Sequence, residues 1–164
     1  MMKKIKAEKL SLEAFKDFGT YANFLEPSGP KLGEEPCEFF RDILIQTFET
    51  SGSTAHSVCR VCPRPLIIAE TENHYNTGEG TMPLDGDVIM HFGPASKDPD
   101  YAKFRAFYIP KGTMLAIRPG VWHHAPFALE DKPVNALVVL PEMTYAKDCY
   151  VIELKGEDRI EIEK

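Results

Sequence analysis

A succession of short apolar segments, each bounded by turn residues, runs from about Cys37 to near the end of this 164-residue chain. The segments are rich in β-branched and aromatic residues, and Gly, Pro, Asp and Asn cluster between them, which is the pattern of short strands. The predicted strands are 43–50, 56–60, 66–74, 80–84, 87–93, 104–109, 114–118, 121–126, 135–140 and 149–154. Many short strands at regular spacing are typical of a sandwich or barrel. The sequence therefore predicts an all-β domain, either an antiparallel barrel or a double-sheet jelly roll.

The turn Asp85-Gly86 carries the clearest local signal within this pattern. An Asp-Gly pair between apolar runs suits a two-residue type I′ turn, because both central residues then adopt positive φ. The sequence predicts that 80–84 and 87–93 pair as an antiparallel hairpin.

The first 36 residues differ from the rest. Ser11 can cap a short helix within 10–19, and 26–36 contains three prolines and two glycines, which predicts a loop. The tail 157–164 alternates charged and apolar residues and is predicted to add solvated surface. A length of 164 residues fits one domain, so we expect a single domain over residues 1–164 with one or two short helices.

The charge and cysteine pattern limits the partners. The net charge of −6 argues against a nucleic-acid partner, which would favour a basic face. No apolar stretch is long enough to cross a bilayer, and no apolar run follows the basic start, so we expect a cytoplasmic protein. Four cysteines are present, and the single CxxC pair, Cys59 and Cys62, lacks the second pair that a structural zinc site needs. We expect reduced, structural thiols.

Ionisable side chains gather on two of the predicted strands. Glu72 and His74 lie on one face of a strand, and Glu79 begins the next one. His123 follows the Pro119-Gly120 turn and faces the opposite way from its neighbours Trp122 and His124. Buried charges need partners or a metal, so the inward face of these strands is the expected site.

The spacing of these residues resembles the two motifs of the cupin superfamily. Glu72, His74, Glu79 and Gly86 follow the spacing of the first motif, and Gly112, Gly120 and His123 follow the second. The chain departs from the pattern where Glu72 replaces the first histidine, Leu66 the opening glycine, Arg118 a proline and Phe127 the final asparagine. The resemblance implies a cupin-type double-stranded β-helix with a metal site at Glu72, His74, Glu79 and His123. Two imidazoles and two carboxylates suit a divalent ion such as Mn, Fe, Ni or Zn.

The stretch from Arg60 to Phe127 is similar to the ureidoglycolate lyase family, which has the cupin fold. The elements that carry this similarity are Arg60, Leu66-Ile67-Ile68, His74, Met82-Pro83-Leu84-Asp85-Gly86-Asp87, Phe104-Arg105-Ala106-Phe107 and Gly120-Val121-Trp122-His123-His124-Ala125-Pro126-Phe127. The family commonly carries Gln at the place of Glu79. The resemblance implies cleavage of ureidoglycolate, a small-molecule substrate, to glyoxylate and urea.

The same resemblance implies roles for further residues. Glu72, Arg105 and His124 are the expected catalytic groups, with His124 alternatively a hydrogen-bonded supporting residue. Arg105, Arg60 and Trp122 are the expected substrate contacts, because an arginine fork can hold a carboxylate through two hydrogen bonds. The two arginines could equally be plain surface charges on strands.

Two other functions stay open. The same ligands would serve a cupin isomerase or dioxygenase, and a cupin pocket can also bind a small acid without catalysis, because one fold hosts many functions. We expect a homodimer, since two-fold dimers are the commonest soluble assembly, with 26–36 as the arm that crosses between protomers.

Overall fold

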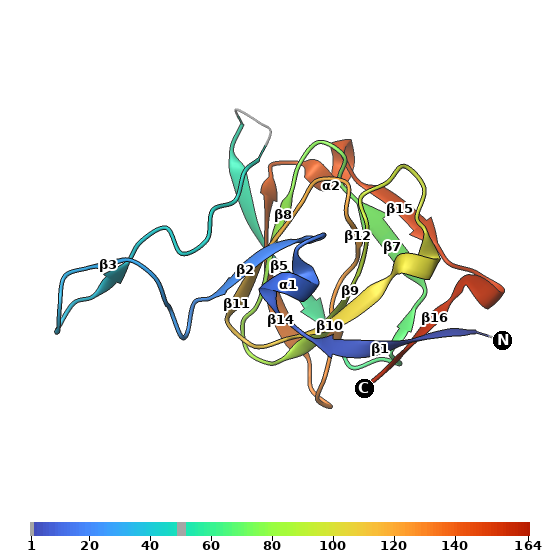
Figure 1. The fold of residues 1–164 in the computed structure, drawn as a ribbon. Coiled ribbons are helices and arrows are strands. Elements are labelled where there is room, and N and C mark those ends of the chain that lie inside the picture. Colours follow the sequence, from blue (N-terminus) through green and yellow to red (C-terminus); the bar gives the residue numbers. More distant parts are fainter. Residues whose placement is uncertain (1, 49–51) are drawn as a thin grey trace.

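The computed structural model describes residues 2–48 and 52–164, and most of its regular structure is β-strand (Figure 1). The strands are β1 (Lys3–Lys9), β2 (Gly19–Asn23), β3 (Lys31–Leu32), β4 (Phe39–Phe40), β5 (Thr54–Val61), β6 (Ile67–Ile68), β7 (Glu70–Asn73), β8 (Glu79–Pro83), β9 (Val88–Gly93), β10 (Arg105–Ile109), β11 (Thr113–Ile117), β12 (Trp122–His123), β13 (Phe127–Ala128), β14 (Val134–Pro141), β15 (Tyr150–Glu153) and β16 (Ile160–Glu163). The α-helices are α1 (Leu12–Phe15) and α2 (Thr144–Lys147), and short 3₁₀ turns form at Tyr101–Lys103 and Gly156–Asp158. The prediction of an all-β fold with one or two short helices is confirmed.

Two sheets face each other and enclose the core, as a jelly roll requires (Figure 1). The larger sheet has the order β15-β7-β12-β9-β10-β1-β16-β6, with β13 also paired to β9. The smaller sheet has the order β2-β11-β8-β14-β5. The β3–β4 hairpin extends away from both, on the left of Figure 1.

The alternation of side chains along β9 divides the interior into two apolar clusters. Val88, Met90 and Phe92 contribute to the cluster between the two sheets, together with Phe15 of α1. Ile89, between them in sequence, contributes to a second cluster with Trp122. Successive residues of a strand point to opposite faces, so both faces of β9 are buried.

The short helix forms as its sequence predicts. Ser11 is the N-cap of α1, and its hydroxyl accepts a hydrogen bond from the Ala14 N–H at 3.1 Å. The buried Phe15 side chain fixes this helix against Phe92, with ring centroids 5.0 Å apart.

The hairpin predicted across Asp85-Gly86 is wrong. β8 pairs with β11 and β14, whereas β9 pairs with strands of the other sheet. Gly86 does not have the positive φ that a type I′ turn needs. The Asp85 carboxylate instead accepts the Asn135 N–H at 2.8 Å, and that of Asp87 accepts the Lys111 N–H at 2.8 Å. Between these two contacts the chain passes from β8 in the smaller sheet to β9 in the larger sheet.

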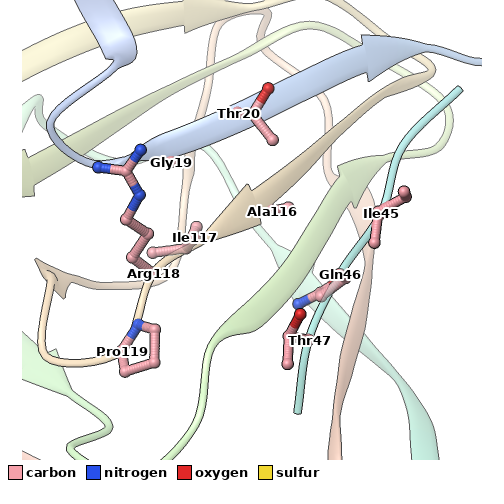
Figure 2. A pocket seen from close by; sticks show the side chains of 9 residues that line it. All are labelled: Gly19, Thr20, Ile45, Gln46, Thr47, Ala116, Ile117, Arg118 and Pro119. Carbon is pink, nitrogen blue, oxygen red and sulfur yellow. The ribbon is translucent and has the colours of Figure 1, made fainter.

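Two further expectations need correction. Residues 43–48 form no strand, and 49–50 lie outside the described residues; residues 45–47 instead line a groove of about 200 Å³ beside the end of β11, together with Arg118 (Figure 2). The C-terminal tail is not merely solvated surface. It forms β16, which pairs in parallel with β1 and buries Ile160 and Ile162.

No helix among the described residues has both the length and the apolar character needed to cross a bilayer.

Candidate metal centre

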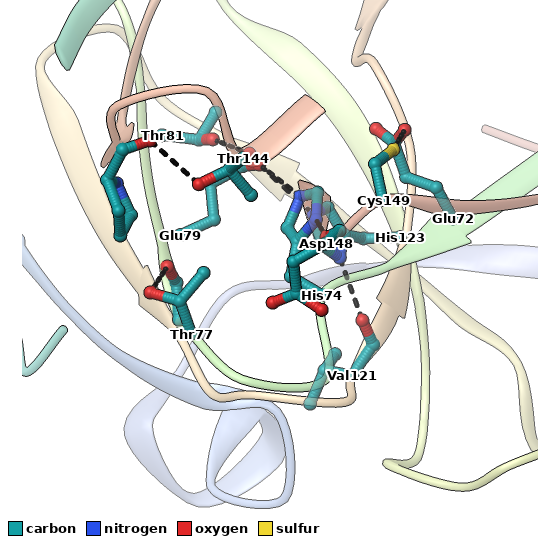
Figure 3. A network of polar contacts seen from close by, with 12 residues as sticks. Glu72, His74, Thr77, Glu79, Thr81, Val121, His123, Thr144, Asp148 and Cys149 are labelled. Carbon is teal, nitrogen blue, oxygen red and sulfur yellow. Dashed lines mark hydrogen bonds and ion pairs between the residues drawn. The ribbon is translucent and has the colours of Figure 1, made fainter. Parts of the chain in front are cut away.

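Four side chains with metal-binding chemistry meet in the space between the two sheets (Figure 3). Glu72 and His74 come from the end of β7, and His123 comes from β12, where it pairs directly with Glu72 across the strands. Glu79 reaches the same point from β8 in the opposite sheet. One ligand atom each of Glu72, His74 and His123 lies within 4.8 Å of the others. The structure thus joins residues that are up to 51 positions apart in the chain.

Backbone carbonyls hold both imidazole rings in the same tautomer. His74 Nδ1 lies 2.6 Å from the Asp148 carbonyl oxygen, and His123 Nδ1 lies 2.8 Å from that of Val121 (Figure 3). A carbonyl can only accept, so each Nδ1 carries the proton and donates it. The Nε2 atoms are then left to face the centre of the cluster, as metal-binding imidazoles do.

Glu79 lies between the two rings. Its Oε2 is 3.2 Å from His74 Nε2 and 3.3 Å from His123 Nε2, and its Oε1 accepts the Thr81 hydroxyl at 2.5 Å. Burial by itself would raise the pKa of Glu79, but the nearby charge on His123 and the hydrogen bonds from His74 and Thr81 hold it well below its usual range. Burial by itself would lower the pKa of His123, but the Glu79 carboxylate raises it to about 9. Without a metal, the cluster therefore holds a proton on His123.

The cluster fits a divalent cation. The 3.3 Å approach of His123 Nε2 to Glu79 is not aligned as a hydrogen bond, so within the described residues this buried nitrogen has no hydrogen-bond partner. Buried polar atoms are rarely left unpaired, and an ion between the two Nε2 atoms would satisfy this one. Two neutral imidazoles and two carboxylates are a donor set for first-row divalent metals, and the two carboxylates would balance the charge.

Glu72 is held by a thiol that the sequence did not point to. Cys149 Sγ donates to Glu72 Oε2 at 3.2 Å. Burial, the hydrogen bond and the charge of Glu72 raise the pKa of Cys149 to about 12, so the thiol keeps its proton at neutral pH. Asp148, next in the chain, supplies the carbonyl to His74, and its carboxylate accepts the backbone N–H groups of Tyr75 and Asn76. No motif spacing could have found these two residues, which lie more than 70 positions from their partners.

The cluster lies at one side of a cavity of about 240 Å³ that opens to solvent. The cavity is lined by Ser57, Val58, Cys59, Glu72, His74, Glu79, Thr81, Met90, Ala125, Pro126, Val138, Leu140, Tyr145 and Cys149. Among these residues there is no lysine and no arginine.

The remaining expected site residues do not line this cavity. Arg105 binds Glu8 through two hydrogen bonds, at 2.8 and 2.6 Å, and donates a third to the Ala14 carbonyl. Arg60 is exposed on β5. Trp122 is fully buried in the second apolar cluster, and its Nε1 donates to Ser96. His124 lies 3.5 Å from Glu70, and both line a separate hollow with His91.

His91 is a buried histidine that lies apart from the metal cluster. It is 1% exposed, stacks on Phe104 at 5.7 Å, and its Nε2 lies 3.3 Å from the Thr71 hydroxyl. Burial and the nearby histidines hold the pKa of His91 well below its usual range. It is a neutral residue outside the metal cluster.

The ureidoglycolate lyase family model matches residues 2–162. The ureidoglycolate lyase of Rhodobacter capsulatus is 26% identical over 124 residues, which cover 74% of this chain and 77% of that protein.

Solved structures of Bacillus subtilis oxalate decarboxylase resemble the chain more distantly. One, a study of its Mn(II) centres, is 21% identical with a TM-score of 0.45, and covers 63% of this chain and 24% of that chain. Another, determined at pH 4.6, is 20% identical with a TM-score of 0.45 and the same coverage. The match thus spans about a quarter of that longer protein.

Since the family model spans almost the whole sequence, the chain belongs to the ureidoglycolate lyase family.

Proposed function

We propose that this protein cleaves ureidoglycolate to glyoxylate and urea, with a divalent metal held by His74, His123, Glu79 and Glu72. The observation that carries the proposal is the convergence of these four side chains, three of which line a cavity, in a member of this family. The reaction is an elimination in which the substrate hydroxyl becomes a carbonyl and urea departs. It needs a base at the hydroxyl and a proton for the leaving nitrogen.

Glu72 is positioned to move that proton. It is the less buried of the two carboxylates, and the Cys149 thiol holds its Oε2 while its Oε1 has no hydrogen bond within the described residues. We assign Glu72 the removal of the hydroxyl proton and its return to the nitrogen as the C–N bond breaks. A bound divalent metal would supply Lewis acidity, which lowers the pKa of a coordinated hydroxyl.

The sequence predicted that an arginine would bind the substrate carboxylate. No described residue lining the cavity carries a guanidinium or ammonium group. A small anion placed beside Glu72 and Glu79 would meet two like charges, so its binding needs the metal or a protonated imidazole. A bound divalent metal would supply this positive charge.

Elemental analysis of protein purified without added metal, together with an assay of glyoxylate release, tests the proposal. We expect close to one Mn, Fe, Ni or Zn ion per chain and release of glyoxylate from ureidoglycolate that falls when the metal is removed. Metal-free protein with undiminished activity would contradict the metal role, and absence of glyoxylate release from metal-loaded protein would contradict the reaction.

Arg105→Ala is expected to lower stability and to leave the KM for ureidoglycolate unchanged. The paired hydrogen bonds to Glu8 join β10 to β1, but both side chains are about a third exposed, so the loss should be about 1 kcal/mol. Denaturant unfolding and steady-state kinetics measure the two effects. The exposed Arg60→Ala serves as the control, and a rise in KM for Arg105→Ala alone would return that residue to the substrate site.

We also propose that the protein is a cytoplasmic homodimer. The four cysteines are free thiols, as a reducing compartment favours. The β3–β4 hairpin extends away from the sheets and exposes Leu32 and Phe39, each more than half accessible, which suits a contact with a second copy. Light scattering at micromolar concentration should give twice the mass of the chain, and a monomer would contradict the proposal.

A further inference from the structure

The cavity beside the metal cluster is lined by two chemically different groups of residues. The polar group includes Glu72, Glu79 and His74. The other group forms an apolar wall of aliphatic and thioether side chains, contributed by Val58, Met90, Ala125, Pro126, Val138 and Leu140. A substrate bound with its hydroxy acid at the metal cluster therefore turns its other end toward an apolar wall.

The polar groups near that wall are largely engaged with the protein itself. The Thr81 hydroxyl donates to Glu79, and the Cys149 thiol donates to Glu72. The Tyr145 hydroxyl donates to Met143 Sδ at 3.4 Å. Of the described lining residues, Ser57 has a hydroxyl without a protein partner, and it lies at the exposed rim on the edge strand β5. The free Cys59 thiol also lines the cavity, but a thiol is a weak donor and a weak acceptor. The wall thus offers little to hydrogen-bond a terminal amide.

The ureido end of ureidoglycolate fits this wall poorly. Its terminal NH₂ group carries two donors that leave water when the substrate binds. A buried donor without a partner costs free energy, whereas a methyl group of the same size would gain by leaving water. A binding site discriminates most strongly between two substrates when one of them leaves buried polar groups without hydrogen-bond partners.

We infer that the cavity takes as substrates N-acyl-α-hydroxyglycines whose acyl group is apolar, and prefers them to ureidoglycolate. This inference rests on the proposed function, since it assigns the same elimination to a wider substrate class. The reaction is R–CO–NH–CH(OH)–COO⁻ → R–CO–NH₂ + OHC–COO⁻. The hydroxyl O–H and the C–N bond break, the carbonyl π bond forms, and the nitrogen keeps the C–N electron pair and gains the hydroxyl proton. No oxidant or co-reactant is needed.

Unreactive analogues without the hydroxyl isolate the acyl preference. Ureidoacetate, N-acetylglycine and N-butyrylglycine share one carboxylate end and differ only in the acyl group. We expect N-acetylglycine to bind about 10-fold more tightly than ureidoacetate, because a methyl replaces the unpaired NH₂. Each further methylene should tighten binding by about 4-fold until the wall is filled. Isothermal calorimetry on the metal-loaded protein measures all three dissociation constants.

A valine on the wall gives a matched pair of variants. Val138→Thr keeps the side-chain shape and adds a hydroxyl to the wall, so the preference for N-butyrylglycine over ureidoacetate should fall by at least about 3-fold. Val151→Thr makes the same change at an exposed position of β15 that does not line the cavity, and should leave the ratio unaltered. Because both ligands are measured on the same protein, the ratio of their dissociation constants is insensitive to a small loss of folded protein.

The outcomes separate this inference from the proposed function. Equal or tighter binding of ureidoacetate relative to N-acetylglycine overturns the acyl preference, even when ureidoglycolate is cleaved. Tighter binding of the apolar analogues with no glyoxylate released from ureidoglycolate supports the preference and rejects the proposed reaction. An unchanged binding ratio in Val138→Thr would show that the preference does not arise at this wall.

Discussion

Replacing His123 with alanine is expected to lower the affinity for the divalent metal by at least about 100-fold. Changes to residues that merely orient a metal ligand cost 10- to 100-fold, and His123 is placed to be a ligand itself. Its ring is fixed by the Val121 carbonyl, and its Nε2 points to the cluster and otherwise has no hydrogen-bond partner within the described residues. Metal titration of the apoprotein measures the loss. Glyoxylate release at limiting metal should fall by a similar factor.

His124→Ala is the matched control for this variant. The two histidines are adjacent, but His123 ends β12 and reaches the cluster, whereas His124 lies near the partly exposed Glu70 in a separate hollow. The control should keep its metal and most of its activity. Loss of metal in the control but not in His123→Ala would assign the site to the other face of the sheet.

The four residues of the cluster could be predicted from two signals, the alternation of side chains along strands and the spacing of the two motifs. Strand alternation puts Glu72 and His74 on one face, and it separates His123 from His124. The motif spacing added Glu79. What remained hidden was the side of the barrel from which Glu79 arrives. The composition of Asp85-Gly86 is typical of a hairpin. In the structure, the carboxylates of Asp85 and Asp87 accept the backbone N–H groups of Asn135 and Lys111, and the chain passes from one sheet to the other. These partners are distant in sequence, so the local pattern does not reveal them.

Arg105 shows why the substrate contacts were harder to predict. A residue within a family-like segment can serve either the site or the fold, and sequence does not say which. Its partner is Glu8 on β1, and the parallel pairing of β1 with β10 joins segments about 100 residues apart. The alternating residues of β1 and β16 signal strands only weakly, because each has one solvated face rich in lysine or glutamate.

Glu79→Gln is expected to weaken metal binding by about 10-fold or more. Glutamine keeps the size of the side chain and can still contact His74, His123 and Thr81, but it brings no negative charge to the cation. Glu70→Gln makes the same chemical change on β7 at an exposed carboxylate outside the cavity, and should leave the metal affinity unaltered. Titration of both apoproteins with the metal found in the native protein measures the difference. Equal affinities would remove Glu79 from the ligand set.

The same variant should change how the stability of the metal-free protein depends on pH. The folded pKa of His123, about 9, lies above its ordinary value of 6.5, so its contribution is complete below about pH 6.5 and is lost as pH rises through about 9. The folded pKa of Glu79 is lowered, so its contribution is present above its ordinary value of 4.5 and is lost as pH falls below it. The unfolding midpoint of the metal-free native protein should therefore decrease as pH rises from about 6.5 to 9. Glu79→Gln removes the larger of the two charges that raise the His123 pKa, while Glu72 remains, so this decrease should become smaller. Thermal unfolding of both proteins in matched buffers measures this decrease. A decrease of the same size in both proteins would show that the His123–Glu79 pair does not hold the proton.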